Sequence, residues 1–529
     1  MGAEIHRCWR ERWKLLRGAG IAMVIGFMAA YLVPKVLGEE FLVRQVARIY
    51  APLVGALYGH RHRDEVSVML IDDAALQSAG QSWPAEYAYY GRLLDAMTTY
   101  RPRAVFIDVI FAAARKDPGL DRLIAAACRA RQAGGSVYFA TRRDPAGRFL
   151  LRPELEAVSP RCLQKVAVEY DPDAADQTAW TYPVAADSSA QGDAVRSVAG
   201  TIYRDLGGRM PAHQHSELAV DWGLAPAARG IDWLALPSAE HAGGHEAAAG
   251  IPENPAAGHA PEPALDSYCR SPVPLWRELL VPPFFRSAVW GDEGVGKPIC
   301  VFHNTLYPAD LQAASDADEQ ALARHVEGRV VMVGTALQGS NDRVLSPLHG
   351  RIPGVYMHAM ALDNLLTYGS DYRRAAHLAW GRDGVPVAAL VMFALLLIMV
   401  GRAFSKRLHA SDFDAGGVSD AAPRLRRRAK EAARWLVWKV SGLAIYSVFF
   451  GLMLLVGQWL HLGFLTVIHV SLFAFAAEWL EWSDSMLEWW RAEPGEGETT
   501  RPGDGPAARP APAPHSRATG RRPDPSETR

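Results

Sequence analysis

Four long apolar segments interrupt the sequence, one near its beginning and three toward its end. They cover residues 19–37, 385–401, 440–457 and 462–479. Each is close to the length of about 20 apolar residues that a helix needs to cross the hydrocarbon core of a membrane. The hydropathy pattern therefore predicts four transmembrane helices, with residues 38–384 held together on one side of the membrane.

Basic residues predict how these segments are oriented. Residues 1–18 and the loop 402–439 are both rich in Lys and Arg, as cytoplasmic segments usually are. Both termini are therefore expected in the cytoplasm, and residues 38–384 outside it, in the periplasm of a bacterial cell. A cleaved signal peptide is the alternative for the first segment, but no small-x-small cleavage site follows it, so we expect a retained anchor. The basic loop could also bind anionic membrane lipid or a partner, although its charge is explained by topology alone.

Residues 38–384 show a regular alternation of strand and helix patterns. Short runs of apolar and β-branched residues predict buried strands at 66–71, 104–109, 136–141 and 329–335. Residues 87–100 place apolar side chains at helical spacing between the first two strands. The pattern predicts an α/β domain in which a mixed or parallel sheet is flanked by helices.

Three other segments lack this alternation. Residues 225–263 are rich in Ala, Gly, Pro and His without an apolar period, which predicts a long insertion or a disordered loop. Residues 492–529 are rich in Pro, Gly, Ala and Arg and predict a disordered cytoplasmic tail. Residues 480–491 are rich in Trp, which favours a helix along the inner membrane interface; a docking helix for a cytoplasmic partner is the alternative.

Charge and histidine spacing exclude several kinds of ligand. The formal net charge is -1, so the chain has no overall attraction for nucleic acid. The close pairs His213/His215 and His241/His245 have no accompanying set of carboxylates or thiols. We therefore expect no nucleic-acid partner, no metal ion and no cofactor.

The cysteines suggest a structural role outside the cytoplasm. Cys128, Cys162, Cys269 and Cys300 fall in the segment that is expected to face an oxidising compartment. Four cysteines allow three pairings, and the sequence does not choose between them. We expect one disulfide bond.

Three blocks of this segment resemble a known family. They read VSVMLIDDAALQSAGQSWP, then RAVFIDVIFAAARKDPGLDRLIAAA, and later GRVVMVGTALQGSNDRVLSPLHGRIPGVYMHAMALDNLL. Together they are similar to the CHASE2 family, the cyclase- and histidine-kinase-associated sensory extracellular domains of type 2. The matching positions are Asp72, Asp73, Gly80, Trp83, Pro84, Asp108, Phe111, Asp117, Leu120, Gly334, Asp342, Pro347, Pro353, Gly354, His358 and Ala359.

The resemblance covers roughly residues 45–375 and implies an arrangement in the membrane. In this family the sensory domain lies outside the membrane, between one N-terminal span and commonly three C-terminal spans, which is the layout that the apolar segments predict. Ala85 and Glu86 depart from the family, where an aromatic and a basic residue tend to follow the Trp-Pro pair. Family members usually carry a cyclase or kinase domain after the last span, whereas residues 480–529 show no such motif. We therefore expect the output to come from a separate cytoplasmic protein.

Six residues are candidates for a ligand-binding site: Asp72, Asp73, Trp83, Asp108, Asp342 and His358. The aspartates follow or border predicted strands, at the edge where open α/β sheets bind ligands, and they would contact a cation or the amine and hydroxyl groups of a small molecule. Capping of the following helices is the alternative for each carboxylate. Trp83 fits either a lid over the pocket or a rigid turn packed on the core. His358 fits a buried histidine paired with a carboxylate, or a pH sensor. No residue is assigned a catalytic role.

Three hypotheses follow for the function. The first is a sensor or receptor of the bacterial inner membrane that binds an unknown small ligand and signals through its helices. The second is a structural subunit that docks an envelope protein without signalling. The third is an extracytoplasmic hydrolase, which ranks last because no nucleophile-base set accompanies the carboxylates. Association into a homo-oligomer is left open.

Overall fold

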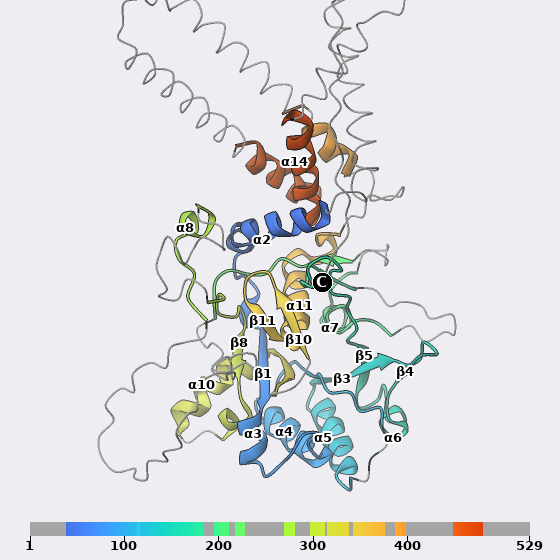
Figure 1. Ribbon diagram of the computed structural model, residues 1–529. Helices are drawn as coiled ribbons and strands as arrows, with labels where there is room; N and C mark the ends of the chain where they lie inside the picture. Colours follow the sequence, from blue (N-terminus) through green and yellow to red (C-terminus); the bar gives the residue numbers. More distant parts are fainter. Residues whose placement is uncertain are drawn as a thin grey trace, which may run out of the picture. The chain divides into compact units, whose positions relative to one another are not determined.

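A seven-stranded sheet lies at the centre of the computed structural model (Figure 1). Its strands follow the spatial order β4-β3-β2-β9-β1-β8, and β5 also pairs with β3. Every pair is parallel except that of β3 with β4. The strands are β1 (Val66–Asp72), β2 (Ala104–Ile107), β3 (Ser136–Arg143), β4 (Phe149–Leu150), β5 (Gln164–Ala167), β8 (Asn304–Leu306) and β9 (Val330–Ala336).

The described part of the chain is discontinuous. It comprises residues 39–113, 115, 117–184, 195–210, 217–227, 269–280, 297–312, 315–337, 342–375, 387–394, 396–397 and 448–479. The predicted span 19–37, the loop 402–439, residues 480–529, nearly all of the insertion 225–263 and the two histidine pairs lie outside the described residues.

The central strands are buried on both faces. In β1, Val66, Val68 and Leu70 belong to one hydrophobic core, and Met69 and Ile71 belong to a second core on the other face. Successive side chains of a strand point to opposite faces of its sheet, so a run of apolar residues without alternation requires cover on both sides.

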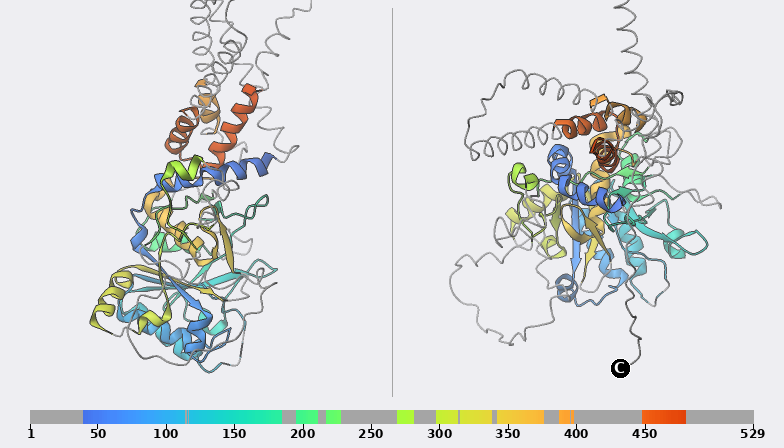
Figure 2. Two further views of the ribbon diagram at one scale, coloured as in Figure 1. Left: turned by 60° about the vertical axis from the view of Figure 1, so that its left-hand side comes forward. Right: turned by 45° about the horizontal axis from the view of Figure 1, so that its top comes forward.

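Helices provide this cover (Figures 1 and 2). α4 (Tyr87–Thr99) and α5 (Leu120–Gln132) pack against each other on one face. On the other face, α11 (Val355–Tyr368) packs against β1, β9 and α7 (Val198–Asp205). The smaller helices are α3 (Asp73–Ser78), α6 (Pro153–Glu156), α8 (Leu275–Leu280) and α10 (Asp316–Val326), with 3-10 turns at Arg63–Glu65, Pro308–Leu311 and Gly369–Asp371.

Two small antiparallel pairs position residues of the site. β10 (Arg343–Ser346) and β11 (Gly350–Pro353) form a hairpin that leads directly into α11. β6 (Thr181–Tyr182) pairs with β7 (Leu218–Ala219), and Tyr182 packs in the same core as α11.

A third core joins helices from both ends of the described chain. α2 (Glu39–Tyr58) packs against α14 (Phe464–Trp479), together with helical residues 387–394 and 448–459. Val43 and Val54 of α2 meet Leu390, Met453 and Ile468 there. Segments that are more than 400 residues apart in the sequence are therefore held together by apolar contact.

The spanning helices remain a prediction. No helix within the described residues combines the length and the apolar character needed to cross a membrane. Residues 385–401 and 440–457 are described only in part, and residues 464–479 form α14 within the predicted segment 462–479.

The predicted α/β fold is confirmed, with a mixed sheet that is mostly parallel and has helices on both faces. The four expected strands are all present, although β2 ends at Ile107, two residues earlier than predicted. The sequence pattern missed α2 and β8. β8 has only three residues, too few to establish a period, and it belongs to the sheet only through its pairing with β1.

The structure contains two disulfide bonds, where one was expected. Cys128 of α5 is joined to Cys162, and Cys269 is joined to Cys300. The sequence could not select this pairing because it depends on which segments the sheet brings together.

Candidate ligand-binding site

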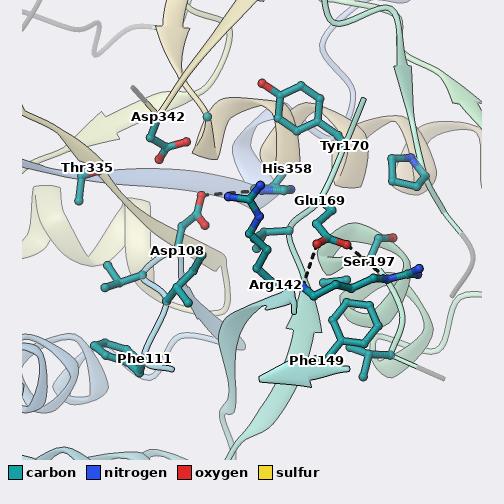
Figure 3. Close-up of a pocket in the computed structure, with 18 of the residues that line it drawn as sticks. Asp108, Phe111, Arg142, Phe149, Glu169, Tyr170, Ser197, Thr335, Asp342 and His358 are labelled. Atoms are coloured by element: carbon teal, nitrogen blue, oxygen red, sulfur yellow. Dashed lines mark hydrogen bonds and ion pairs between the residues drawn. The ribbon is translucent and has the colours of Figure 1, made fainter. Parts of the chain in front are cut away.

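A cavity of about 1180 Å³ lies at the carboxyl ends of the parallel strands. Its lining includes Asp108, which follows β2, Arg142 at the end of β3 and Thr335 near the end of β9. Glu169, which follows β5, and His358 of α11 lie on the same cavity (Figure 3). Ligands of open α/β sheets bind at this edge, so the cavity is the candidate site.

Asp108 is held at the edge of the sheet by its backbone. Its N–H donates to the carbonyl of Val333 in β9 over 2.8 Å, which fixes the residue just beyond the last paired position of β2. The Asp108 side chain is 9% exposed, and its Oδ2 lies 3.7 Å from Nε2 of His358. That separation is longer than a hydrogen bond. No residue that the structure describes donates a hydrogen bond to this carboxyl group.

His358 is buried and oriented by Tyr182. The Tyr182 hydroxyl lies 2.9 Å from Nδ1 of His358 and accepts a hydrogen bond from the Ala199 backbone N–H at 3.4 Å. Burial raises the pKa of Tyr182, so its hydroxyl keeps its proton and can donate it to Nδ1. This arrangement favours the neutral tautomer with the proton on Nε2, the nitrogen that faces Asp108.

Burial opposes charge on both members of this contact. It lowers the pKa of His358 from 6.5 to about 3, so the imidazole is neutral at pH 7. It also raises the pKa of the Asp108 carboxyl group, and the nearby charge of Asp342 raises it further. The contact between Asp108 and His358 is therefore not a pairing of opposite charges at neutral pH.

Asp342 lies against the beginning of α11. The Gly354 N–H donates to the Asp342 carbonyl over 3.1 Å, and a Cβ atom added to Gly354 would overlap Oδ1 of Asp342. The first turn of a helix favours negative charge, while burial raises the pKa of this carboxyl group. A larger residue at position 354 would force the Asp342 carboxyl group to move.

The cavity also carries positive charge. Arg143 pairs with Glu169, with 3.4 Å between Nε and Oε2, and Arg115 pairs with Asp117 at 3.2 Å. The guanidinium group of Arg115 also lies 4.2 Å from the centre of the Tyr87 ring. Figure 3 shows Arg142 directed from β3 into the cavity. Among the described residues, none forms a side-chain hydrogen bond or an ion pair with Arg142.

Aromatic rings form the remaining wall. Phe111 and Phe149 are 4% and 5% exposed, and Tyr170 also lines the cavity, apart from these two rings in the view of Figure 3. Trp83 is 47% exposed and precedes a cis peptide bond to Pro84. Trp83 is therefore half-exposed where it lines the cavity.

Four of the six predicted residues line one cavity. Trp83, Asp108, Asp342 and His358 are brought together there, although they come from segments more than 200 residues apart. Asp72 instead caps α3, since its Oδ1 accepts a hydrogen bond from the Ala75 N–H at 2.7 Å. The capping alternative is thus correct for Asp72. Asp73 is exposed on the first turn of α3, and neither residue lines the cavity.

Three residues of the site were not predicted from the sequence. Arg142 and Glu169 follow strand patterns that end in charged residues, the same signal that pointed to Asp108, but neither was selected. Tyr182 gave no signal, because it lies in a two-residue strand whose contact with His358 exists only in three dimensions. Within the described residues, no group of three or more His, Cys, Asp or Glu side chains could hold a metal ion.

The fold and the cavity define an α/β domain with a ligand-sized cavity at the carboxyl edge of its sheet. A family model of the CHASE2 domain matches residues 36–400. The chain belongs to the CHASE2 family, a family of extracytoplasmic sensory domains, which is consistent with a role as a sensor. No curated protein and no solved structure matches the chain.

Proposed function

We propose that this protein is a sensor of the bacterial inner membrane. Its CHASE2 domain lies in the periplasm and binds a small molecule in the cavity, and its helices pass the resulting change to a separate cytoplasmic protein. The observation that carries the proposal is the buried Asp108 carboxyl group, which faces the cavity without a hydrogen bond from the described residues. A buried polar group that lacks a partner costs free energy, and a bound ligand that donates to Asp108 would recover it.

α11 is the element that would transmit binding. Its first turn carries His358 on the cavity, and about one and a half turns later it carries Asp363 and Asn364 in a buried network. Asp363 accepts a hydrogen bond from the Tyr58 hydroxyl of α2 and lies 3.3 Å from Nε2 of His303. A shift of α11 on ligand binding would therefore act directly on α2.

The chain beyond α11 supplies a second connection. Arg373 forms a buried ion pair with Asp221, with 2.7 Å between Nη1 and Oδ2. Its neighbour Arg374 accepts a hydrogen bond from the Gly463 N–H at 2.8 Å, one residue before α14 begins. These contacts support transmission from the cavity to the core that contains α2 and α14.

A stripe of exposed apolar side chains supports placement at a membrane. Val448, Leu452, Leu455 and Trp459 are 36–77% exposed and recur at intervals of three or four residues along one helical segment. Such spacing puts them on one face of the helix. We propose that this face contacts lipid, because Val448, Leu452 and Leu455 lie in a segment that hydropathy assigns to the membrane and Trp459 lies just beyond its end.

A docking role is the second candidate, and the same stripe is what favours it. If the exposed face binds an envelope protein instead of lipid, the domain is a fixed subunit and the cavity needs no occupant. A small molecule held at Asp108 distinguishes the two functions, since only the sensor requires it.

Native mass spectrometry of the full chain, extracted from membranes of expressing cells, tests the sensor. We expect a small molecule of defined mass on the wild type and its loss from Asp108→Asn. Asp121→Asn, at an exposed position in the first turn of α5 outside the cavity lining, is the matched control and should retain the molecule. Burial raises the pKa of the Asp108 carboxyl group, so a neutral amide at this position should not impair folding. The sensor proposal is wrong if the wild type carries nothing and cell extract does not raise its melting temperature.

A further inference from the structure

One carboxyl group on the cavity, that of Asp108, receives no hydrogen bond from the described residues. Asp108 is nine-tenths buried and faces the neutral imidazole of His358 at 3.7 Å. Asp342 lies near enough to add a second carboxyl group of the same sign. A ligand group with positive charge would favour the ionised form of these carboxyl groups, which burial opposes, and could hydrogen-bond to Asp108.

Arg142, on the same cavity, forms no side-chain hydrogen bond or ion pair with any residue that the structure describes. Arg142 projects from the end of β3, whereas its neighbour Arg143 is already paired with Glu169 (Figure 3). No ion pair joins Arg142 to Asp108 within the described residues, and both side chains line the cavity. The guanidinium group offers a fork of N–H donors that suits a carboxylate.

Apolar surface lies next to both charges. Phe111, Phe149 and Tyr170 line the cavity beside Asp108 and Arg142, and Tyr170 is close enough to the carboxyl groups that their charge helps to raise the pKa of its hydroxyl, after burial. A ligand that touches both charged positions would place its remaining atoms on these rings. The cavity volume of about 1180 Å³ easily holds a molecule of this size.

We propose that the ligand is a small zwitterion of the amino-acid class, whose ammonium group binds Asp108 and whose carboxylate binds Arg142. This inference rests on the proposed sensor function and names the chemical class of its ligand. A purely cationic ligand would bring no acceptor for Arg142, and a purely anionic one would bring no donor for the Asp108 carboxyl group.

The test is isothermal titration calorimetry of the full chain with each standard amino acid. The tightest binder is then compared with its methyl ester, which keeps the ammonium group, and with its N-acetyl derivative, which keeps the carboxylate. We expect each derivative to bind at least about tenfold more weakly than the parent compound, because each loses one charge-assisted hydrogen bond.

Two variants assign each charge to its residue. Asp108→Asn should abolish the discrimination against the N-acetyl derivative, and Arg142→Gln should abolish the discrimination against the ester. Asp121→Asn and Arg148→Gln are the matched controls, since both positions lie outside the cavity lining and Arg148 is 66% exposed in an ion pair with Asp144. The controls should keep the wild-type order of affinities.

The outcomes separate the ligand class from the function. If either derivative binds as tightly as the parent, or if no amino acid binds, the zwitterion is the wrong class. A molecule of another class retained in native mass spectrometry would then leave the sensor proposal standing. If nothing is retained, cell extract does not raise the melting temperature and no amino acid binds, both proposals fail together.

Discussion

At the scale of single residues, the site depends on groups whose charge is opposed by burial. His358 is 2% exposed, packs edge-on against the Phe106 and Tyr182 rings and faces Asp108. His358 is thus a buried histidine beside a carboxyl group, at a separation of 3.7 Å that is longer than a hydrogen bond. Among the described residues, no carboxylate lies within hydrogen-bonding distance of this imidazole, so its protonated form gains little stabilisation.

A prediction for pH follows from His358. Its pKa is lowered from 6.5 to about 3, so below pH 6.5 the unfolded chain binds the proton first and the free energy of unfolding falls as the pH falls toward 3. His358→Gln keeps polar atoms for Tyr182 but removes this titration, which should flatten the acid slope by up to about 1.4 kcal/mol per pH unit. Urea unfolding of the full chain between pH 7 and pH 4 measures the slope.

The control for this experiment is His62→Gln. His62 lies near the surface, 2.7 Å from Glu65, and away from the cavity. This variant should keep the wild-type slope below pH 6.5. An unchanged slope in His358→Gln would show that the buried imidazole does not govern the acid response.

At the scale of the elements, the close approach of β9 and α11 fixes the shape of the site. A Cβ atom added to Gly334 of β9 would lie 2.5 Å from Cβ of Val355 at the start of α11. Sequence analysis gave Gly334 as a position of the CHASE2 pattern, and the structure supplies the physical reason, because strand and helix backbones almost touch there. This contact helps to position two residues that line the cavity. They are Thr335, which follows Gly334 in β9, and His358 of α11.

Gly334→Ala should therefore lower the free energy of unfolding, although it adds only one methyl group. Overpacking at a well-filled contact typically costs about 1–3 kcal/mol, and here it would push α11 away from the sheet. The melting temperature and the ligand affinity should both fall. Gly451→Ala is the matched control, because no atom lies within 4 Å of the added Cβ there. Equal melting temperatures for the two variants would contradict the close approach.

The disulfide bonds act at the same scale. Cys128–Cys162 joins α5 to the segment before β5 and closes a sequence separation of 34 residues. Loops of this length imply a stabilisation of about 2–4 kcal/mol, mainly by restricting the unfolded chain. Replacing both cysteines by Ala should lower the free energy of unfolding by that amount, as measured in urea.

Peptide mapping without reductant provides the companion test. It should recover two linked peptides, one for Cys128–Cys162 and one for Cys269–Cys300. Unlinked cysteines in protein purified from the periplasmic side would contradict both the pairing and the oxidising location.

At the scale of the whole molecule, α11 joins the cavity to the core of α2 and α14. Gly354, just before α11, and His358 within it line the cavity. Asp363, farther along the same helix, accepts a hydrogen bond from the Tyr58 hydroxyl of α2. A ligand shifts such a system only as far as it binds one arrangement better than the other. The contact between Tyr58 and Asp363 is therefore where coupling can be broken without altering the cavity.

Tyr58→Phe tests this coupling. It removes the hydroxyl but keeps the ring packed against Phe302 and Tyr368. We expect ligand affinity within about threefold of wild type, a stability loss of about 1–2 kcal/mol, and loss of the ligand-induced change in hydrogen exchange of α2. Tyr50→Phe is the control on the same helix, where the ring packs on Phe450. A full response of α2 in Tyr58→Phe would show that transmission takes another route.

The sequence by itself determined the α/β class, the strands and the family, because apolar runs, helical spacing and local motifs are properties of neighbouring residues. It also pointed to Asp108, Asp342 and His358 through their motifs. It could not separate Asp72 from these residues, because a carboxylate that caps the next helix and one that faces a cavity share the same local pattern.

Only the tertiary structure decided which residues meet. The order of the parallel strands brought Asp108, Arg142 and His358 to one cavity, selected the pairing of the cysteines, and packed α2 against α14. Each of these results depends on contacts between distant segments, and contact of this kind leaves no period or spacing in the chain. The physical reason is that local propensity sets the elements, whereas burial of both sheet faces sets their arrangement.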